Sequence, residues 1–266
     1  MNENNRPSPL DPALSIPPRI PNGGRRFHVI ACHVLWRELC RFASESGNVF
    51  TFSFLKQGLH NTPDILRREL QAGIDGAPEE CDAVLIGYGL CSNGAAGIRA
   101  RNKPLVFMRG HDCITFLLGS KELYREYFDA NPGTYWYSAG WLETTLMPGP
   151  DRERKLREYY EKTFGADNAA FLMESELGWI RNYSRAAYIE TGAAGEAGEA
   201  ACREYSRECA RALKWDFRVF KGRMDLIRGF LEGRWPESDF LTVEPGRETA
   251  ASYDGLVMKS VPSGTT

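Results

Sequence analysis

The sequence lacks the features that define several large classes of protein. No apolar run approaches the roughly 20 residues that cross a bilayer, and the N-terminus has no charged start followed by an apolar segment. A net charge of -2 provides no general electrostatic attraction for nucleic acid or anionic lipid. We therefore expect a cytoplasmic protein with a small-molecule substrate and with neither a nucleic-acid nor a membrane partner.

Closely spaced cysteine pairs are also lacking, because no Cys-x-x-Cys occurs among the 7 cysteines. An odd number of cysteines scattered over 266 residues favours reduced thiols over a disulfide framework. Cys202 and Cys209 stand seven residues apart in a helical pattern with no other ligand type between them, and are expected to pack as small hydrophobes. Cys40, within a helical pattern, and Cys81, just before a strand, are also expected to be structural.

Proline is concentrated at the start of the chain, where residues 1–25 are predicted to form an extended or disordered arm. From Arg26 onward the pattern changes to short apolar runs followed by helical periodicity, with strands predicted at residues 27–32, 50–54, 83–86 and 104–108. Thr62 and Pro63 mark a helix start. Four strand-then-helix units in a row predict an α/β fold: a parallel-rich sheet of Rossmann-like βα units with helices on both faces.

The same patterns continue less regularly in the second half of the chain. We predict an N-terminal α/β lobe over residues 26–145, which includes a strand in GTYWYSAGWLE, and a second, smaller α/β lobe over residues 146–258. Within the second lobe, GAAGEAG is expected to be a flexible joint before a helix. Residues 259–266 are predicted to be a flexible tail.

Three cysteines, Cys32, Cys91 and Cys113, each follow a predicted strand and stand in or beside a turn. The carboxyl ends of parallel strands lie side by side, so these thiols are expected to converge on one site. Thiolates bind zinc and iron-sulfur clusters, and three protein ligands leave one position open for substrate. The alternative is three unrelated cysteines that pack in the core.

His111, Asp112 and Cys113 form the sharpest local pattern. In an extended segment, residues two apart point to the same side, so His111 and Cys113 could reach one ion while Asp112 supports a ligand. The alternative for Asp112 is that it caps the following helix. His60, just before the helix start at Thr62, is a further candidate, so His111, Asp112 and His60 form the predicted catalytic group.

The remaining histidines and a glycine-rich stretch are weaker candidates. His33 directly follows Cys32, whereas His28 lies early in its strand, far from the carboxyl end. The stretch GYGLCSNGAAG matches neither G-x-G-x-x-G nor a P-loop. Glycines at these positions allow the backbone to approach a bound metal or ligand closely. The cofactor-binding positions expected here are Gly87, Gly89 and Gly94.

The core, from about Arg26 to Val257, resembles an uncharacterised domain-of-unknown-function family of bacteria and archaea. The resemblance rests on the segments GLHNTPDILRRELQ, IGYGLCSNG, RGHDCITFLLGS, GTYWYSAGW and FLEGRW with SYDG. Some members of that family occur with corrinoid-dependent methyltransferase systems. Separately, His111-x-Cys113 resembles the zinc site of methyltransferases that activate thiols and accept methyl groups from corrinoid proteins. In those enzymes the third ligand follows the His-x-Cys pair, whereas Cys32 and Cys91 precede it here.

Two hypotheses follow for function. The first is a metal-dependent enzyme of one-carbon or corrinoid methyl metabolism, with a cysteine-rich zinc or iron-sulfur site at the strand ends and a corrinoid protein as a partner. The second is a non-catalytic accessory protein that carries or inserts a metal or a corrinoid. Metal and sulfide content after anaerobic purification would separate them.

Overall fold

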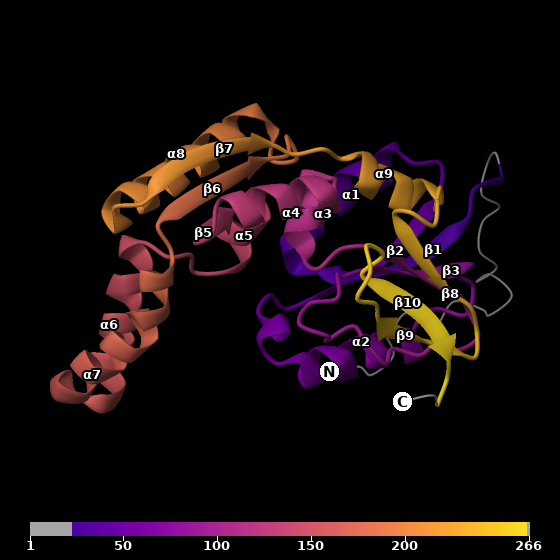
Figure 1. The fold of residues 1–266 in the computed structure, drawn as a ribbon, viewed down its shortest axis with the longest axis horizontal. Coiled ribbons are helices and arrows are strands. Elements are labelled where there is room, and N and C mark those ends of the chain that lie inside the picture. The colour runs from indigo at the N-terminus through magenta and orange to yellow at the C-terminus, as the bar shows by residue number, and fades with distance from the viewer. Residues whose placement is uncertain (1–22, 265–266) are drawn as a thin grey trace, which may run out of the picture.

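A five-stranded, mainly parallel sheet forms one half of the protein (Figure 1). The computed structural model describes residues 23–264, so the predicted arm, apart from residues 23–25, lies outside the described residues. The strand order is β2-β1-β3-β4-β8, with β1 (Arg26–Cys32), β2 (Val49–Leu55), β3 (Ala83–Gly87), β4 (Leu105–Met108) and β8 (Phe240–Val243). Phe27 pairs with Ala83 in parallel, which confirms the predicted arrangement of β1 and β3. Only β8 runs antiparallel, against β4.

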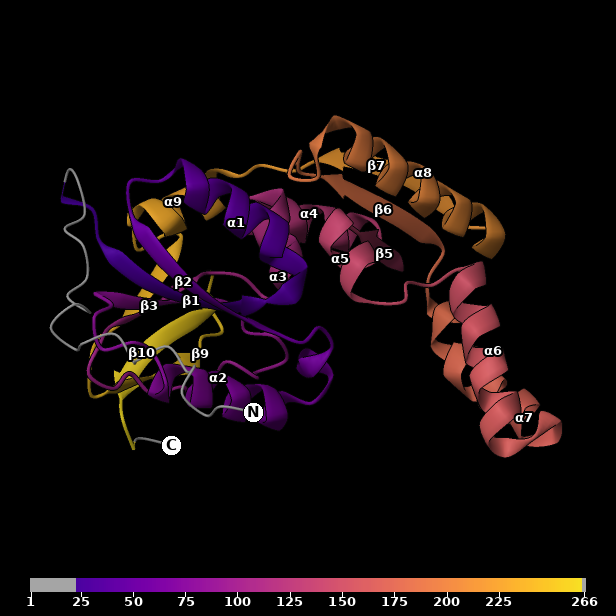
Figure 2. The ribbon, with the colours of Figure 1, turned by 180° about the vertical axis from the view of Figure 1, so that it is seen from behind.

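Helices cover both faces of this sheet. They are η3 (His33–Leu35), α1 (Trp36–Glu45), η4 (Leu59–Asn61), α2 (Pro63–Asp75), α3 (Cys113–Leu118), α4 (Lys121–Ala130) and α9 (Asp225–Glu232). Figures 1 and 2 show α1, α3 and α9 on one side and α2 on the other. Helices α1 and α2 each bury an apolar stripe, which includes Leu39 and Phe42 in α1 and Leu66 and Leu70 in α2. The prediction of a mixed α/β fold with a mainly parallel sheet is therefore confirmed.

A separate three-stranded parallel sheet, in the order β5-β6-β7, occupies the other half of the protein (Figure 1). Its elements are β5 (Thr134–Tyr137), α5 (Ala139–Thr144), α6 (Pro150–Phe164), α7 (Ala166–Leu177), η5 (Gly178–Asn182), β6 (Arg185–Glu190), α8 (Gly195–Leu213) and β7 (Asp216–Lys221). The strands on either side of the expected boundary near residue 145 do not divide between the two sheets at that residue. β5 leaves the first four strands to pair with β6, and the late strand β8 joins β4 instead. The division into lobes stays a prediction.

Two segments that were expected to be flexible are regular. Helix α8 begins at Gly195, so the second half of the GAAGEAG segment is helical. β10 (Met258–Pro262) pairs with β9 (Arg247–Ala251) in an antiparallel hairpin where a flexible tail was predicted from residue 259. The Arg247 side chain supports the hairpin by donating to the Ser260 hydroxyl at 2.8 Å. Within residues 23–264, no helix combines the length and apolar character needed to cross a bilayer.

A buried pair of carboxyl groups lies where α1 meets the three-stranded sheet. Glu38 accepts a hydrogen bond from the Thr191 hydroxyl at 2.7 Å, and Glu199 accepts one from Tyr188 at 2.6 Å. Glu38 Oε2 has no hydrogen-bond partner among the described residues. Burial raises the pKa of Glu38 to about 6, and the negative charge of Glu199 adds to the shift. The contact between the two halves is thus most stable when Glu38 is protonated.

Glu38→Gln is expected to stabilise the protein at neutral pH. Because the pKa of Glu38 is raised in the folded state, the protonated carboxyl stabilises the fold fully below pH 4.5. This stabilisation is lost as the pH rises through about 6. The amide cannot ionise, so the variant should gain up to about 2 kcal/mol in free energy of unfolding at pH 8. Urea unfolding between pH 4 and pH 8 measures this. Thr191→Val, which removes the donor to Glu38, should steepen the pH dependence; a flat wild-type profile would contradict the prediction.

Candidate active site

The loops that follow β3 and β4 are joined by backbone hydrogen bonds at the carboxyl edge of the five-stranded sheet. The Leu90 N–H donates to the Gly110 carbonyl at 2.9 Å, and the Cys91 N–H donates to the His111 carbonyl at 2.8 Å. A methyl group on Gly89 would lie 2.6 Å from the Gly110 carbonyl oxygen, so only glycine permits this approach. The pairing holds together the two loops that carry the predicted ligands.

Cys32 and Cys113 form a hydrogen-bonded pair of thiols at this edge. Cys32 ends β1, and Cys113 begins α3. The Cys113 thiol lowers the pKa of Cys32 by donating a hydrogen bond, and the Val34 N–H and the Tyr88 hydroxyl contribute further, although burial opposes the shift. The same contact, together with burial, raises the pKa of Cys113. The two shifts are opposite in direction, so the first proton lost from the pair leaves Cys32 in preference to Cys113.

Tyr88 is a member of this site that sequence reasoning missed. The side chain is buried, and its hydroxyl has no nitrogen or oxygen partner among the described residues. Burial raises its pKa, and the neighbouring Cys32 adds to the shift, so the hydroxyl stays protonated and can donate to the Cys32 sulfur. The only sequence signal was its position in the glycine-rich stretch directly after β3.

Cys91 lies close to the pair but remains a neutral thiol. Burial raises its pKa to about 12, and the charges of Asp112 and Cys32 act in the same direction. Cys91, Ser92 and Asn93 have φ values of 46°, 55° and 66°, three consecutive left-handed residues that are not glycine. Such a conformation costs about 1 kcal/mol or more per residue and is concentrated at functional sites.

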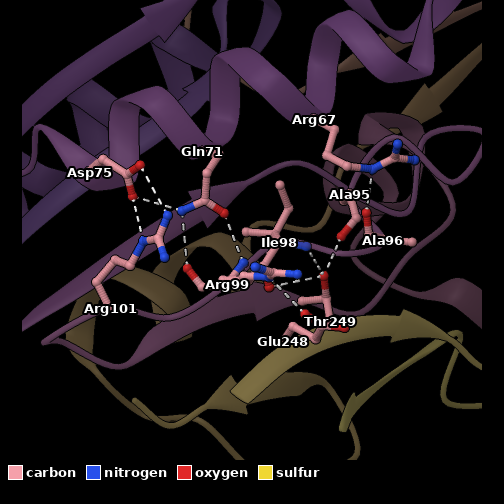
Figure 3. Close-up of polar contacts among 10 residues, drawn as sticks. All are labelled: Arg67, Gln71, Asp75, Ala95, Ala96, Ile98, Arg99, Arg101, Glu248 and Thr249. Atoms are coloured by element: carbon pink, nitrogen blue, oxygen red, sulfur yellow. Dashed lines mark hydrogen bonds and ion pairs between the residues drawn. The ribbon is translucent and has the colours of Figure 1, made fainter. Parts of the chain in front are cut away.

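The segment after this left-handed run is anchored by side chains from two other elements (Figure 3). From α2, Arg67 donates to the Ala96 carbonyl at 2.6 Å. From β9, the Thr249 hydroxyl donates to the Ala95 carbonyl at 2.6 Å and accepts from the Ile98 N–H at 2.9 Å. The network also contains Gln71, Asp75, Arg99, Arg101 and Glu248. These bonds hold the segment against its neighbours and so offset the strain of the three left-handed residues.

A cavity of about 490 Å³, here called the thiol cavity, opens beside these cysteines. Its walls include Cys91, Cys113, His60, His111 and Asp112. The other lining residues are Leu90, Ser92, Asn93, Ile114 and Trp141. Cys32 is buried and is not part of the wall, so of the two paired cysteines it is Cys113 that lines the cavity.

Asp112 caps helix α3, which was the alternative to a catalytic role, and it also lines the thiol cavity. Its Oδ1 accepts from the backbone N–H groups of Ile114 at 3.0 Å and Thr115 at 3.3 Å, which caps α3. Its Oδ2 accepts from the Tyr124 hydroxyl at 3.0 Å. Burial nevertheless raises its pKa. Among the described residues, no lysine or arginine forms an ion pair with it.

The histidines separate into two groups. His60 and His111 line the thiol cavity, and burial lowers the pKa of His60, so its imidazole is neutral at pH 7. His33 instead stacks on Phe54, and His28 is held within the sheet by the Thr51 hydroxyl at 2.7 Å.

The three predicted glycines are occupied by contacts within the protein. A methyl group on Gly87 would lie 2.6 Å from the Ala31 side chain, and one on Gly94 would lie 2.7 Å from that of Leu66. Gly89 faces the loop after β4, as described above. Their assignment to a bound group stays a prediction, but packing accounts for all three.

The predicted zinc or iron-sulfur cofactor does not fit this arrangement. Within residues 23–264, no group of three or more histidine, cysteine, aspartate or glutamate side chains is arranged to hold a metal ion. The physical reason lies in the positions of the donors: Cys32 and Cys113 are paired with each other, and Cys32, unlike Cys91 and Cys113, is not part of the cavity wall. Metal ligation requires several deprotonated donors around one point. The expectation of zinc, an iron-sulfur cluster or a corrinoid cofactor is therefore wrong, since the described residues identify no such group.

A second cavity of about 460 Å³, here called the aromatic cavity, adjoins the first. The two share His60, Asp112, Ile114 and Trp141. The aromatic side chains of the second are Tyr124, Phe128, Tyr135, Trp136, Trp141 and Tyr183. They come from α4, β5, α5 and the end of η5, so the aromatic cavity lies where the two halves of the protein meet. Sequence reasoning missed this wall, although GTYWYSAGW is visibly rich in aromatic residues.

Comparison with known proteins identifies a family but no function. Residues 54–231, well over half of the chain, match the family described as "Protein of unknown function (DUF1638)", and the chain belongs to that family. The match spans Cys91, Cys113 and the aromatic residues but begins after Cys32. No curated protein matches the chain, and no solved structure matches it either.

Proposed function

We propose that the protein carries out thiol-based transfer of a one-carbon group, which Cys113 accepts from a small donor molecule in the thiol cavity. The observation that carries this proposal is the Cys32–Cys113 pair, in which a buried thiol of lowered pKa contacts a thiol on the cavity wall. A thiolate, and not a thiol, is the effective nucleophile, and neighbouring donors that lower its pKa are typical of reactive cysteines.

In the proposed step, Cys32 acts as the base and Cys113 as the nucleophile. The Cys113 sulfur attacks the donor carbon while its proton moves to the Cys32 thiolate. A carbon–sulfur bond forms, the bond between that carbon and the leaving group breaks, and the leaving group keeps the electron pair. The products are alkylated Cys113, a neutral Cys32 thiol and the demethylated donor. The Tyr88 hydroxyl and the Val34 N–H stabilise the Cys32 anion beforehand.

The surrounding residues suit this chemistry. His60 and His111, which both line the thiol cavity, can bind or orient the donor, and Asp112 fixes the start of α3 and hence Cys113. A Rossmann-like arrangement of the sheet would place the ligand at these strand ends. A reducing cytoplasmic location would keep the thiols free, as all seven cysteines are here. The family resemblance, which implies a link with methyltransferase systems, also agrees with a one-carbon donor.

The proposal predicts selective methylation of Cys113. Methyl iodide serves as a small neutral donor, and mass spectrometry of peptides gives the rate at each cysteine. At pH 7 Cys113 should react about tenfold faster than the other thiols, because the pair provides a thiolate below the ordinary thiol pKa. Cys32→Ser should slow methylation of Cys113 about tenfold and move its pH profile upward, since burial then leaves Cys113 protonated at neutral pH.

Cys202→Ser is the matched control and should leave the rate at Cys113 unchanged. Equal rates at Cys113 in the wild type and in Cys32→Ser would refute the proposed base. The same contact between thiols would also suit a dithiol that oxidises to a disulfide. If oxidised glutathione links Cys32 to Cys113 faster than Cys113 is methylated, redox chemistry replaces group transfer. No selectivity at all would favour a non-catalytic binding protein.

A further inference from the structure

The two adjoining cavities differ from most small-molecule sites in the charges on their walls. Among the described residues, no lysine or arginine lines either cavity. The one acidic side chain, Asp112, lies in both. His60 also lies in both, and burial lowers its pKa, so it carries no charge at neutral pH. Phosphate and carboxylate groups are bound in proteins by arginine, lysine or helix N-termini. The N-terminus of α3 lies in the wall but is already capped by the Asp112 carboxylate, so these walls do not suit an anion.

Among the described residues, no lysine or arginine forms an ion pair with the Asp112 carboxylate, and His111 lowers its pKa only against the larger effect of burial. Its three hydrogen-bond donors, two backbone N–H groups and the Tyr124 hydroxyl, are all neutral. A buried carboxylate without a counter-charge is costly, which is why burial raises its pKa. A cation in the cavity would remove that cost. The free energy gained would favour a cationic ligand over a neutral one of the same shape.

The aromatic side chains provide the second half of a cation site. Tyr124 packs edge-to-face on Trp136, with ring centroids 5.9 Å apart and an interplanar angle of 77°. Tyr135 and Tyr183 make the same kind of contact at 5.2 Å and 77°. Walls of tilted aromatic rings around an acidic group are typical of sites that bind quaternary ammonium groups, which are too poorly hydrated to prefer water strongly.

Arg152, whose charge acts on Tyr135 in the wall of the aromatic cavity, already has an anionic partner. Arg152 lowers the pKa of Tyr135 slightly against the larger effect of burial, but it forms an ion pair with Glu176 and lies over Trp179. It is not part of the cavity lining. The walls therefore remain negative in character, and the volume of about 460 Å³ is within the range of small-ligand pockets.

From the aromatic walls and the unpaired acid we infer that the aromatic cavity binds a small onium cation, a quaternary ammonium or a sulfonium group, next to the thiols. The inference that the onium cation is the substrate of Cys113 rests on the proposed function. Binding of the cation can be measured without any reaction. A sulfonium methyl donor fits the step above: the Cys113 sulfur takes one methyl group, and the sulfonium leaves as a neutral thioether with the electron pair. The charges balance, because the Cys32 anion and the cation are both consumed.

Binding is tested on Cys113→Ser, which cannot be methylated at that position, by isothermal titration calorimetry. The probes are choline and 3,3-dimethylbutan-1-ol, which have the same shape and differ in charge. Choline should bind at least about tenfold more tightly, the factor that a buried cation–π contact represents. Asp112→Asn, made in the same background, should reduce that preference, because it removes the carboxylate charge and keeps the aromatic walls, and should leave the neutral alcohol unaffected. Asparagine is an equally good helix cap, so α3 should be retained.

Two further variants make the result specific. Trp141→Leu should weaken choline about tenfold, because it removes one aromatic wall common to both cavities. Asp64→Asn removes the same charge from an exposed position outside the cavities and should change nothing. Equal affinity for choline and the alcohol, tighter binding of the alcohol, or no binding of either would overturn the inference.

Reactivity separates this inference from the proposed function. Wild-type protein incubated with trimethylsulfonium should gain one methyl group on Cys113 and release dimethyl sulfide. If choline binds with the expected preference but Cys113 remains unmodified by trimethylsulfonium and by methyl iodide, the cation site stands and the group-transfer proposal is wrong. If methyl iodide modifies Cys113 selectively and choline shows no preference, the group-transfer proposal stands and the cation site is wrong.

Discussion

Gly89→Ala should destabilise the protein by about 3 kcal/mol or more and separate the two loops that hold the thiols. The new methyl group would lie 2.6 Å from the Gly110 carbonyl oxygen, 2.7 Å from the Asp112 nitrogen and 2.8 Å from the His111 carbonyl carbon. All three atoms belong to the backbone, so no flexible side chain can move aside. Thermal or urea unfolding measures the loss, and Cys113 methylation should lose its selectivity.

The matched control for this substitution is Gly178→Ala. No atom lies within 4 Å of the methyl position at Gly178, and its φ of −55° is helical. Alanine there should be neutral or stabilise by up to about 1 kcal/mol, because it restricts the unfolded chain. If Gly89→Ala unfolds at the same urea concentration as the wild type, the close contact between the loops is not as described.

Arg109→Met should cost about 3 kcal/mol in free energy of unfolding and release the C-terminal hairpin. The buried guanidinium donates to the backbone carbonyls of Glu237 at 2.7 Å, Phe240 at 3.0 Å and Leu256 at 2.9 Å, and also to that of Met258. Methionine has a similar length but no donor, so these acceptors lose their partners. Burial lowers the pKa of Arg109, yet an arginine remains charged at neutral pH.

Hydrogen exchange should localise the effect of Arg109→Met to β9 and β10, which this arginine connects to the end of β4. Arg101→Met is the control, because Arg101 is half exposed and pairs only with Asp75 at the surface. Such a pair contributes about 1 kcal/mol or less. Equal losses in the two variants would show that the buried donor set does not hold the hairpin.

Much of the local structure could be predicted from residue patterns. The strand at residues 27–32, the alternating phenylalanines of β2 and the Thr62-Pro63 helix start all occur as expected. Glycine and cysteine at the ends of apolar runs indicated the strand ends correctly. These features depend on neighbours within one or two turns of chain, so a single sequence contains them.

The candidate site could be predicted only in part. Cys32 and Cys113 are in contact, and Asp112 caps α3, which was one of its two interpretations. The catalytic and ligand roles assigned to these residues stay predictions. The predicted metal was wrong because, within residues 23–264, no three or more histidine, cysteine, aspartate or glutamate side chains are arranged around one point. Ligand geometry depends on side-chain directions, which residue spacing does not contain. The one-carbon chemistry stays a prediction.

By itself, the sequence determined the strands β1 to β4, the helices α1 and α2, and that thiols, a histidine and an acid follow the strands. It did not determine every element: turns lead from β3 to β4 where a helix was expected, and Ala139–Thr144 is a helix where the strand was expected to continue. Only the tertiary structure decided that β5 pairs with β6 and β8 with β4, because the periodicity of a strand does not specify its neighbour. That choice places the aromatic residues of β5 opposite Asp112 and so forms the aromatic cavity. Such contacts form because residues distant in sequence bury surface against one another. No local sequence pattern encodes which distant residues these are.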